Sequence, residues 1–191
     1  MKAGGGAFVS VVGPSGAGKD TIIAFARKTL EADRSFRFVR RLVTRPSDAF
    51  EDHGTISEAE FQTGVEGGVF ALSWRAHGLG YAVPIAARQA VDDGAVAICN
   101  LSRTAIGAAR TLFPRLVVVQ VEASPDIIAA RLAARGREGK ELVAARLERK
   151  IDDVVFAADR RIVNDGAPEE AAAEFVGVLR EIRDRQAAPA S

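Results

Sequence analysis

The sequence predicts an α/β fold of three layers, with helices covering both faces of a mostly parallel sheet. Apolar runs of strand length alternate with segments of helical spacing along nearly the whole chain, which is the order that β-α-β units produce. A glycine-rich turn separates the first apolar run from the first helical segment. The 191 residues are enough for one sizeable domain and too few for two ordinary ones, so we expect a single domain over residues 1–191.

The expected elements follow one another in a regular order. Strands are expected at residues 7–12, 36–39, 69–74, 95–99, 116–121 and 161–163. The runs at 7–12 and 116–121 are continuously apolar or nearly so, which is typical of strands covered on both faces. Segments of helical spacing lie at residues 19–30, 85–92, 104–112, 125–134 and 168–185, with a long amphipathic segment reaching residue 156. Ser57 and Glu60 match the capping pair of a further helix start. A glycine-rich turn is expected to lead from the strand at 69–74 to Tyr81 and Pro84.

The charge and cysteine content exclude several classes of protein. The formal net charge is +1, from 26 basic and 25 acidic side chains, whereas general binding to nucleic acid or a membrane surface requires a large basic excess. Cys99 is the one cysteine, so an intramolecular disulfide is excluded and a reducing, cytoplasmic location is expected. No apolar run approaches the length of a bilayer span. Five of the basic residues are lysines and the rest are arginines, which bind phosphate in a fixed two-pronged geometry.

A phosphate-binding motif lies between the first expected strand and the first expected helix. It has the spacing of a P-loop and consists of Gly13, Pro14, Ser15, Gly16, Ala17, Gly18 and Lys19. Glycines let the backbone N–H groups of such a loop surround phosphate oxygens, and the helix N-terminus that follows favours an anion. The lysine of the motif reaches the β- and γ-phosphates. Because the strand–loop–helix context is present, we expect a nucleotide to bind here.

The residue after the P-loop lysine departs from the motif. This position is ordinarily Ser or Thr, whose hydroxyl binds Mg²⁺, but here it is Asp20, followed by Thr21. In one interpretation the loop no longer binds a metal nucleotide. In a second, the Asp20 carboxylate faces Mg²⁺ directly or through water, since carboxylates are good ligands for this cation. In a third, Asp20 only caps the helix start and complements its dipole.

From Gly13 almost to its end, the chain resembles the guanylate kinase family. The resemblance is carried by the phosphate loop, Thr44-Arg45-Pro46, residues 70–84, the arginine-bearing residues 131–137, and Val163-Asn164-Asp165. It implies a guanylate kinase-like P-loop fold that transfers a phosphoryl group from ATP with Mg²⁺. It also implies an acceptor-binding region at about residues 45–84 and a lid at about residues 131–146.

Three departures distinguish the chain from guanylate kinases. Arg75 and Pro84 stand where that family has the glutamate and serine that help to recognise guanine, and Asn100 stands where it has an acid that serves the metal. The acid is missing from residue 100 while the phosphate loop has gained Asp20. This coincidence favours the second interpretation, in which Asp20 replaces the absent carboxylate.

The same departures resemble one relative family, the ribose 1,5-bisphosphate phosphokinases of phosphonate breakdown. The matching residues are Gly-Lys-Asp-Thr at 18–21, the segments 70–74 and 76–79, Asn100, and Ser102-Arg103. Tyr81-Ala82 departs from the usual Tyr-Gly by one methyl group. This resemblance implies transfer of the γ-phosphoryl of ATP to the 1-phosphate of ribose 1,5-bisphosphate, which gives 5-phosphoribosyl 1-diphosphate and ADP.

The two resemblances imply roles for particular residues. ATP binding is assigned to the P-loop residues Gly13 to Lys19 together with Asp20, Thr21 and Asn164, and metal binding is assigned to Asp20. Catalysis is assigned to Lys19, Arg131 and Arg135, and substrate binding to Arg45, Arg75, His77, Tyr81, Ser102 and Arg103. The assigned lysine and arginines can bind two phosphorylated reactants, because phosphoryl transfer depends on positioning the reactants and on neutralising their negative charge. The acceptor phosphate is already ionised near pH 7, so no general base is required.

Two other functions stay open from the sequence. A guanylate kinase or another nucleoside monophosphate kinase would take a nucleotide in place of the sugar bisphosphate. A non-catalytic guanylate kinase-like interaction module is the third possibility, but such modules typically lack an intact phosphate loop, and Lys19 with its glycines argues against it. The expected partners are small molecules, ATP and a sugar bisphosphate, with no nucleic acid and no membrane. The sequence does not indicate the oligomeric state.

Overall fold

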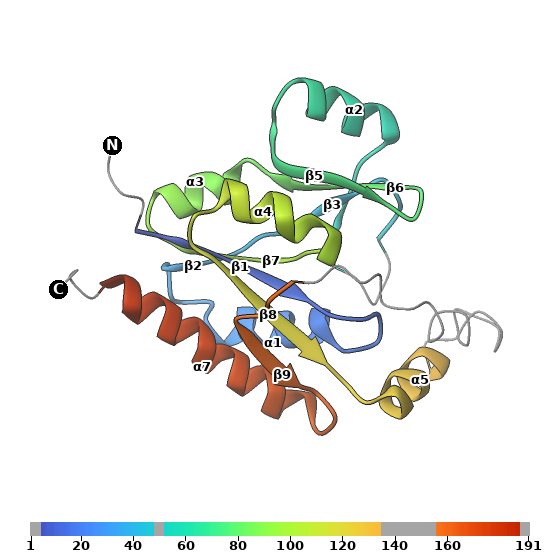
Figure 1. Cartoon of the computed structure of the whole chain (residues 1–191), viewed down its shortest axis with the longest axis vertical. Helices are drawn as coiled ribbons and strands as arrows, with labels where there is room; N and C mark the ends of the chain where they lie inside the picture. The colour runs from blue at the N-terminus through green and yellow to red at the C-terminus, as the bar shows by residue number, and fades with distance from the viewer. Residues whose placement is uncertain (1–4, 48–51, 135–155, 188–191) are drawn as a thin grey trace.

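The computed structural model describes residues 5–47, 52–134 and 156–187. Five strands form one sheet in the order β2-β7-β1-β8-β9, and every pairing between them is parallel. This sheet confirms the parallel arrangement that the alternating sequence predicts, and it runs through the centre of the molecule in Figure 1. Its strands are β1 (Ala7–Val12), β2 (Phe36–Phe38), β7 (Val96–Asn100), β8 (Leu116–Glu122) and β9 (Arg160–Val163).

Helices cover both faces of the sheet and make the three layers. Val9 and Val11 of β1 pack in one core with α1 and α7, whereas Phe8 and Val12 pack in the opposite core with α3 and α4. All six residues of β1 are buried, as expected of a central strand in a covered sheet. The helices are α1 (Lys19–Thr29), α3 (Ala86–Asp92), α4 (Ile106–Leu112), α5 (Pro125–Ala134) and α7 (Pro168–Ala187), with a short 3-10 turn, η1 (Arg103–Ala105), before α4.

A second, smaller sheet stands beside the first and carries α2 (Glu58–Glu66) (Figure 1). Its order is β4-β3-β6-β5, and of these strands the sequence predicts only β5. The expected turn up to residue 84 is wrong in part, because β6 follows directly and pairs antiparallel with β5. β3 and β4 are too short to give a local pattern, and β6 contains glycine and proline, which are depleted in strands. The strands are β3 (Leu42–Val43), β4 (Gly54–Thr55), β5 (Phe70–Ala76) and β6 (Leu79–Pro84).

The predicted capping pair at the start of α2 is confirmed. Ser57 and Glu60 form a complete capping box at the start of α2, with the Glu60 N–H donating to Ser57 Oγ at 3.1 Å and the Ser57 N–H donating to Glu60 Oε2 at 2.7 Å.

Most of the expected lid and the long amphipathic segment lie outside the described residues. Within the described ranges, none of the helices combines the length and the apolar character that crossing a membrane requires.

Candidate active site

The phosphate loop joins β1 to α1 and has a backbone that favours glycine. Gly13, Gly16 and Gly18 have φ of 148°, 87° and 89°, where a side chain is strained. A Cβ at Gly13 would also lie 2.1 Å from the carbonyl oxygen of Val121, so packing against β8 excludes it. Gly16 and Ala17 are buried, whereas Ser15 and Thr21 are exposed. The loop is therefore built on its backbone, as phosphate binding through N–H groups requires.

Two charged side chains follow the loop at the start of α1. The Lys19 ammonium donates to the carbonyl oxygen of Pro14 at 2.8 Å and so lies across the loop. The Asp20 carboxylate accepts a hydrogen bond from Asn100 Nδ2 at 2.9 Å, at the end of β7. Gly18 is the N-cap residue of α1, and within the described part of the chain no side chain makes the capping hydrogen bond. The structure thus places the gained carboxylate beside the position that lacks one.

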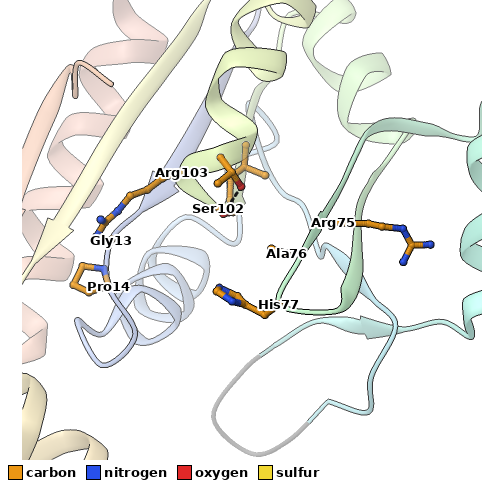
Figure 2. Close-up of a pocket in the computed structure, with 9 residues that line it drawn as sticks. Gly13, Pro14, Arg75, Ala76, His77, Ser102 and Arg103 are labelled. Carbon is orange, nitrogen blue, oxygen red and sulfur yellow. Dashed lines mark hydrogen bonds between the residues drawn. The ribbon is translucent and has the colours of Figure 1, made fainter. Parts of the chain in front are cut away.

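A cavity of about 450 Å³ opens between the phosphate loop and the smaller sheet. It brings together three segments that are distant in the sequence: the loop, the tip of the β5–β6 hairpin, and the turn that follows β7. Figure 2 shows the His77 ring pointing into it and the Arg103 guanidinium pointing toward Gly13. The lining residues are Gly13, Pro14, Arg75, Ala76, His77, Leu101, Ser102, Arg103 and Thr104.

The hairpin tip holds His77 in place by its backbone geometry. Ala76 pairs with Leu79, so His77 and Gly78 alone make the turn, with φ of 51° and 75°. Two positive φ angles are typical of the type I′ turn, whose twist matches that of a β-hairpin. Across the cavity, the Ser102 and Thr104 hydroxyls are hydrogen-bonded to each other at 2.9 Å. The cavity therefore presents an imidazole, a guanidinium and two hydroxyls to one space.

Arg75 does not direct its charge into this cavity. Figure 2 shows its guanidinium turned away from the other lining side chains. The group is paired with the Glu58 carboxylate at the start of α2, and it lies over the Phe61 ring at 4.9 Å. The hydrogen bond from Arg75 lowers the pKa of Glu58 below its usual value. In this conformation α2 supplies the partner of Arg75, and the contact of Arg75 with an acceptor phosphate stays a prediction.

Tyr81 lies in β6 of the smaller sheet, and Arg45 follows β3 of the same sheet. Tyr81 stacks on Trp74 of the neighbouring strand, with ring centroids 5.3 Å apart, and the Arg41 guanidinium lies 5.7 Å from its ring centroid. Arg41 also donates to the backbone carbonyl of Asn100 at 3.4 Å. Arg45 is half-buried just after β3. Among the described residues that line the cavity, neither Arg45 nor Tyr81 is included.

The other predicted nucleotide-binding residues surround Gly18. The side chain of Asn164 is almost fully buried at 1% exposure, and its Nδ2 donates to the carbonyl of Ala17 at 2.8 Å. The Arg131 guanidinium comes from α5, and its Nη1 would lie 3.7 Å from a Cβ at Gly18. Both side chains therefore reach the phosphate loop, and Asn164 does so through its hydrogen bond to the Ala17 carbonyl. Arg135 lies outside the described residues.

Cys99 precedes Asn100 but takes no part in the chemistry of this site. Its side chain is buried in the sheet, and this burial raises the pKa of the thiol to about 12. A thiol in that state is protonated at neutral pH and is a poor nucleophile.

Comparison with known proteins identifies the family. The ribose 1,5-bisphosphate phosphokinase PhnN of Methylobacterium radiotolerans is 50% identical over 175 residues, which cover 92% of this chain and 98% of that protein. The protein of the same name from Acidiphilium cryptum is 45% identical over 184 residues, covering 96% and 98% of the two chains. The chain belongs to the ribose 1,5-bisphosphate phosphokinase family.

Comparison with solved structures tests the expected fold. The crystal structure of guanylate kinase from Anaplasma phagocytophilum superposes on the chain with a TM-score of 0.69 at 20% identity, covering 93% of this chain and 86% of that one. The guanylate kinase-like fold expected from the sequence is confirmed for this phosphokinase family member. No protein-family model matches the chain.

Sequence reasoning missed several residues that this phosphokinase fold brings to the site. Thr104 shares the cavity with Ser102, and Arg41 reaches both Tyr81 and Asn100. A hydroxyl two positions after Ser102 is a signal that the sequence did contain, since residues just beyond a parallel strand lie at the ligand-binding edge of the sheet. The position of Arg41 gave no signal, because the strands β3 and β6 that place it were not predicted.

Proposed function

We propose that the chain transfers the γ-phosphoryl group of ATP to the 1-phosphate of ribose 1,5-bisphosphate, in phosphonate catabolism. An oxygen of the 1-phosphate forms a bond to the γ-phosphorus, and the bond from that phosphorus to the β–γ bridging oxygen breaks. The products are 5-phosphoribosyl 1-diphosphate and ADP. Membership of the phosphokinase family supports this substrate pair, since the relatives bear the name of that activity.

The cavity is the observation that carries the proposal. It joins the phosphate loop directly to His77, Ser102, Arg103 and Thr104, so the donor phosphates and an acceptor phosphate can lie in one space. Phosphoryl transfer needs the two reactants in line and little covalent help from the protein. Bringing the acceptor to the open side of the loop is therefore most of what the protein has to do.

The donor side is assigned to the phosphate loop and α5. The loop N–H groups and Lys19 hold the β- and γ-phosphates, and Arg131 adds a second cation from beside Gly18. These charges stabilise the negative charge that spreads over the transferred group. Asn164 supports the loop from behind, because its amide holds the Ala17 carbonyl. Arg135 stays a prediction in this assignment.

The residues beside the loop fit Mg²⁺. Asp20 supplies a carboxylate, and Asn100 Oδ1 is a buried amide oxygen with no hydrogen-bond partner in the described part of the chain. Mg²⁺ prefers oxygen ligands and is usually held by one or two protein groups together with phosphates and water. We assign it to Asp20, with Asn100 fixing the carboxylate. When bound, the ion neutralises charge on the nucleotide phosphates.

The acceptor side is assigned to the opposite wall of the cavity. Arg103 supplies the cation, because it points toward the loop (Figure 2). The hydroxyls of Ser102 and Thr104 donate to phosphate or sugar oxygens, and His77 closes the space from the hairpin tip. Arg45 and Tyr81 stay predictions for substrate contacts, and Arg75 is not included in the assignment.

A comparison of acceptors tests the proposal. The chain is assayed with ATP, Mg²⁺ and either ribose 1,5-bisphosphate or GMP, and the phosphorylated product is identified by mass spectrometry. We expect kcat/KM for the sugar bisphosphate to exceed that for GMP by at least about a hundredfold, since a polar site rejects an analogue that leaves its groups unpaired. Lys19→Ala is the control and should lose about 100-fold or more in kcat. Faster turnover of GMP would overturn the proposal.

A further inference from the structure

Two side chains that meet at Gly18 each carry a buried polar atom that has no partner in the described part of the chain. Asn164 Oδ1 is an acceptor and Arg131 Nη1 is a donor, and neither has a hydrogen bond within residues 5–47, 52–134 and 156–187. Both side chains approach the same point, because a Cβ at Gly18 would lie 2.3 Å from Asn164 Nδ2 and 3.7 Å from Arg131 Nη1. Buried polar atoms are nearly always paired, so each such atom calls for an explanation.

The orientation of the Asn164 amide follows from its one hydrogen bond. The carbonyl oxygen of Ala17 can only accept, so the Asn164 nitrogen faces it, at 2.8 Å. Asn164 Oδ1 must then face away from that carbonyl. The amide is held at 1% exposure, which leaves it no surface for direct contact with a nucleotide base. It can act on a nucleotide only through a neighbour.

The loop after β9 also positions the helix that carries Arg131. Asp165 Oδ1 accepts a hydrogen bond from the Ser124 N–H at 2.6 Å, immediately before α5 begins. Neighbouring residues of one loop therefore hold the phosphate loop, through Asn164, and the start of α5, through Asp165. This arrangement fixes the distance between Arg131 and the phosphate loop.

We propose that Asn164 is a positioning residue whose Oδ1 accepts a hydrogen bond from Arg131 Nη1 when nucleotide is bound. The guanidinium has five N–H donors in a rigid plane, so anchoring one edge aims the others at the donor phosphates. Gly18 has no side chain and leaves room for both groups at this point. The inference rests on the proposed function in placing Arg131 on those phosphates, and it assigns Asn164 an indirect role.

A double-mutant cycle tests this coupling. The dissociation constant of Mg-ATP is measured by calorimetry for the whole chain, for Asn164→Ala, for Arg131→Met and for the double variant. We expect each single change to weaken binding about tenfold, and the double variant to bind no more weakly than Arg131→Met alone, because contacting residues are not additive. If the two factors multiply, Asn164 supports only the loop and the proposal is wrong.

Two further variants separate positioning from folding. Asn164→Asp gives up the hydrogen bond to the Ala17 carbonyl, since a carboxylate cannot donate, but keeps an oxygen facing Arg131. Arg131→Met should therefore still weaken binding about tenfold in that background, and loss of this effect would contradict the proposal even if Asn164→Ala did not fold. Val163→Ala is the matched control, since Val163 is the adjacent residue and is 60% exposed; its affinity should equal that of the unchanged chain. Calorimetry reports on ATP alone, so failure to phosphorylate the sugar bisphosphate with this cycle intact would instead contradict the proposed function.

Discussion

Asn100 Nδ2 donates to Asp20 Oδ1 at 2.9 Å although 80 positions separate the two residues in the sequence. The parallel pairing of β1 with β7 brings them together, because Val11 is opposite Asn100 and the phosphate loop leaves β1 at the same edge. Two carboxylates at this distance would repel each other, and one would take up a proton. An acid in the loop with an amide at residue 100 keeps a single negative charge at the site. The acid that the resemblance to guanylate kinases places at residue 100 is thus replaced by an acid at residue 20. The site keeps one negative charge for a metal ion.

This arrangement predicts the magnesium dependence of Asp20 variants. Asp20→Ser should raise the Mg²⁺ concentration for half-maximal rate, because a neutral hydroxyl is a weaker ligand than a carboxylate. Adding Asn100→Asp to that variant should recover part of the loss, since it returns a carboxylate to the same place. The measurement is a Mg²⁺ titration at saturating ATP for the unchanged chain, both single variants and the double variant. An unchanged Mg²⁺ concentration for half-maximal rate in Asp20→Ser would contradict the assignment of the metal to Asp20.

Arg103 and Arg75 make a matched pair for testing the acceptor wall. Both line the cavity, but only Arg103 points toward the loop, whereas Arg75 is paired with Glu58. Arg103→Gln should raise KM for the sugar bisphosphate about tenfold or more, as expected for a lost charged hydrogen bond. Arg75→Gln should change it by less than about twofold, because its charge is held at the surface. Steady-state kinetics decides, and a larger effect at Arg75 would mean that the guanidinium swings inward on binding.

At the scale of elements, the β5–β6 hairpin forms one wall of the cavity, and α2 packs against this hairpin. A Cβ at Gly80 of β6 would lie 3.0 Å from the Phe61 ring, so the helix packs closely on the hairpin. The pair between Arg75 and Glu58 adds a second tie between the same two elements. Because His77 stands at the tip of this hairpin, the position of α2 determines where the imidazole lies. The stability of a surface helix is thereby linked to the acceptor site.

Removing the cap of α2 tests that link. Ser57→Ala removes the hydroxyl that accepts the Glu60 N–H but keeps the backbone N–H that donates to Glu60. The loss of this cap should lower the free energy of unfolding by about 1 kcal/mol. If α2 positions the hairpin, KM for the sugar bisphosphate should rise while KM for ATP stays unchanged. Thr63→Ala is the control, since it removes an exposed hydroxyl from the interior of the same helix. Urea unfolding and steady-state kinetics on the three chains measure both effects, and an equal change in the two KM values would contradict the link.

At the scale of the whole molecule, an ion pair joins α7 to the segment just before β2. Arg183 of α7 donates to Asp33 Oδ2 at 2.7 Å, across 150 positions of sequence. Asp33 precedes β2, where its other oxygen accepts hydrogen bonds from the backbone and hydroxyl of Ser35. These hydrogen bonds, with the smaller effect of Arg183, lower the pKa of Asp33 below its ordinary value of 3.8. The carboxylate form of Asp33 is therefore favoured in the folded chain.

The lowered pKa sets the pH range in which this contribution is lost. The stabilisation is complete above the ordinary pKa of the carboxyl group and disappears as pH falls through the lower pKa of the folded state. Asp33→Asn should therefore reduce Tm near neutral pH and flatten its decline below about pH 4. Asp93→Asn makes the same charge change at an exposed site and should keep the steeper decline. Parallel slopes in all three chains would show that Asp33 does not contribute.

The local signals in the sequence determined the central sheet, the phosphate loop and the helices beside it. The central strands β1, β7 and β8 are largely apolar runs that stand out from their neighbours, because a strand covered on both faces needs apolar residues. The edge strands β2 and β9 contain arginine and are only partly buried. The loop is recognised by glycines whose positive φ angles the structure confirms. The residues at 18–21, 70–74, 76–79, 100 and 102–103 indicated a resemblance to the phosphokinase family, which the comparisons confirm.

Tertiary structure alone decided how the side chains of the site are used. The strands β3, β4 and β6 were not predicted from the sequence, and they form by pairing with one another and with β5. Arg75 turns from the cavity because α2 presents Glu58 to it, and Asn164 is buried because Gly18 lets it reach the Ala17 carbonyl. Such outcomes depend on which partner lies nearest in space. A sequence carries that information only through the whole fold, because the competing partners are distant along the chain.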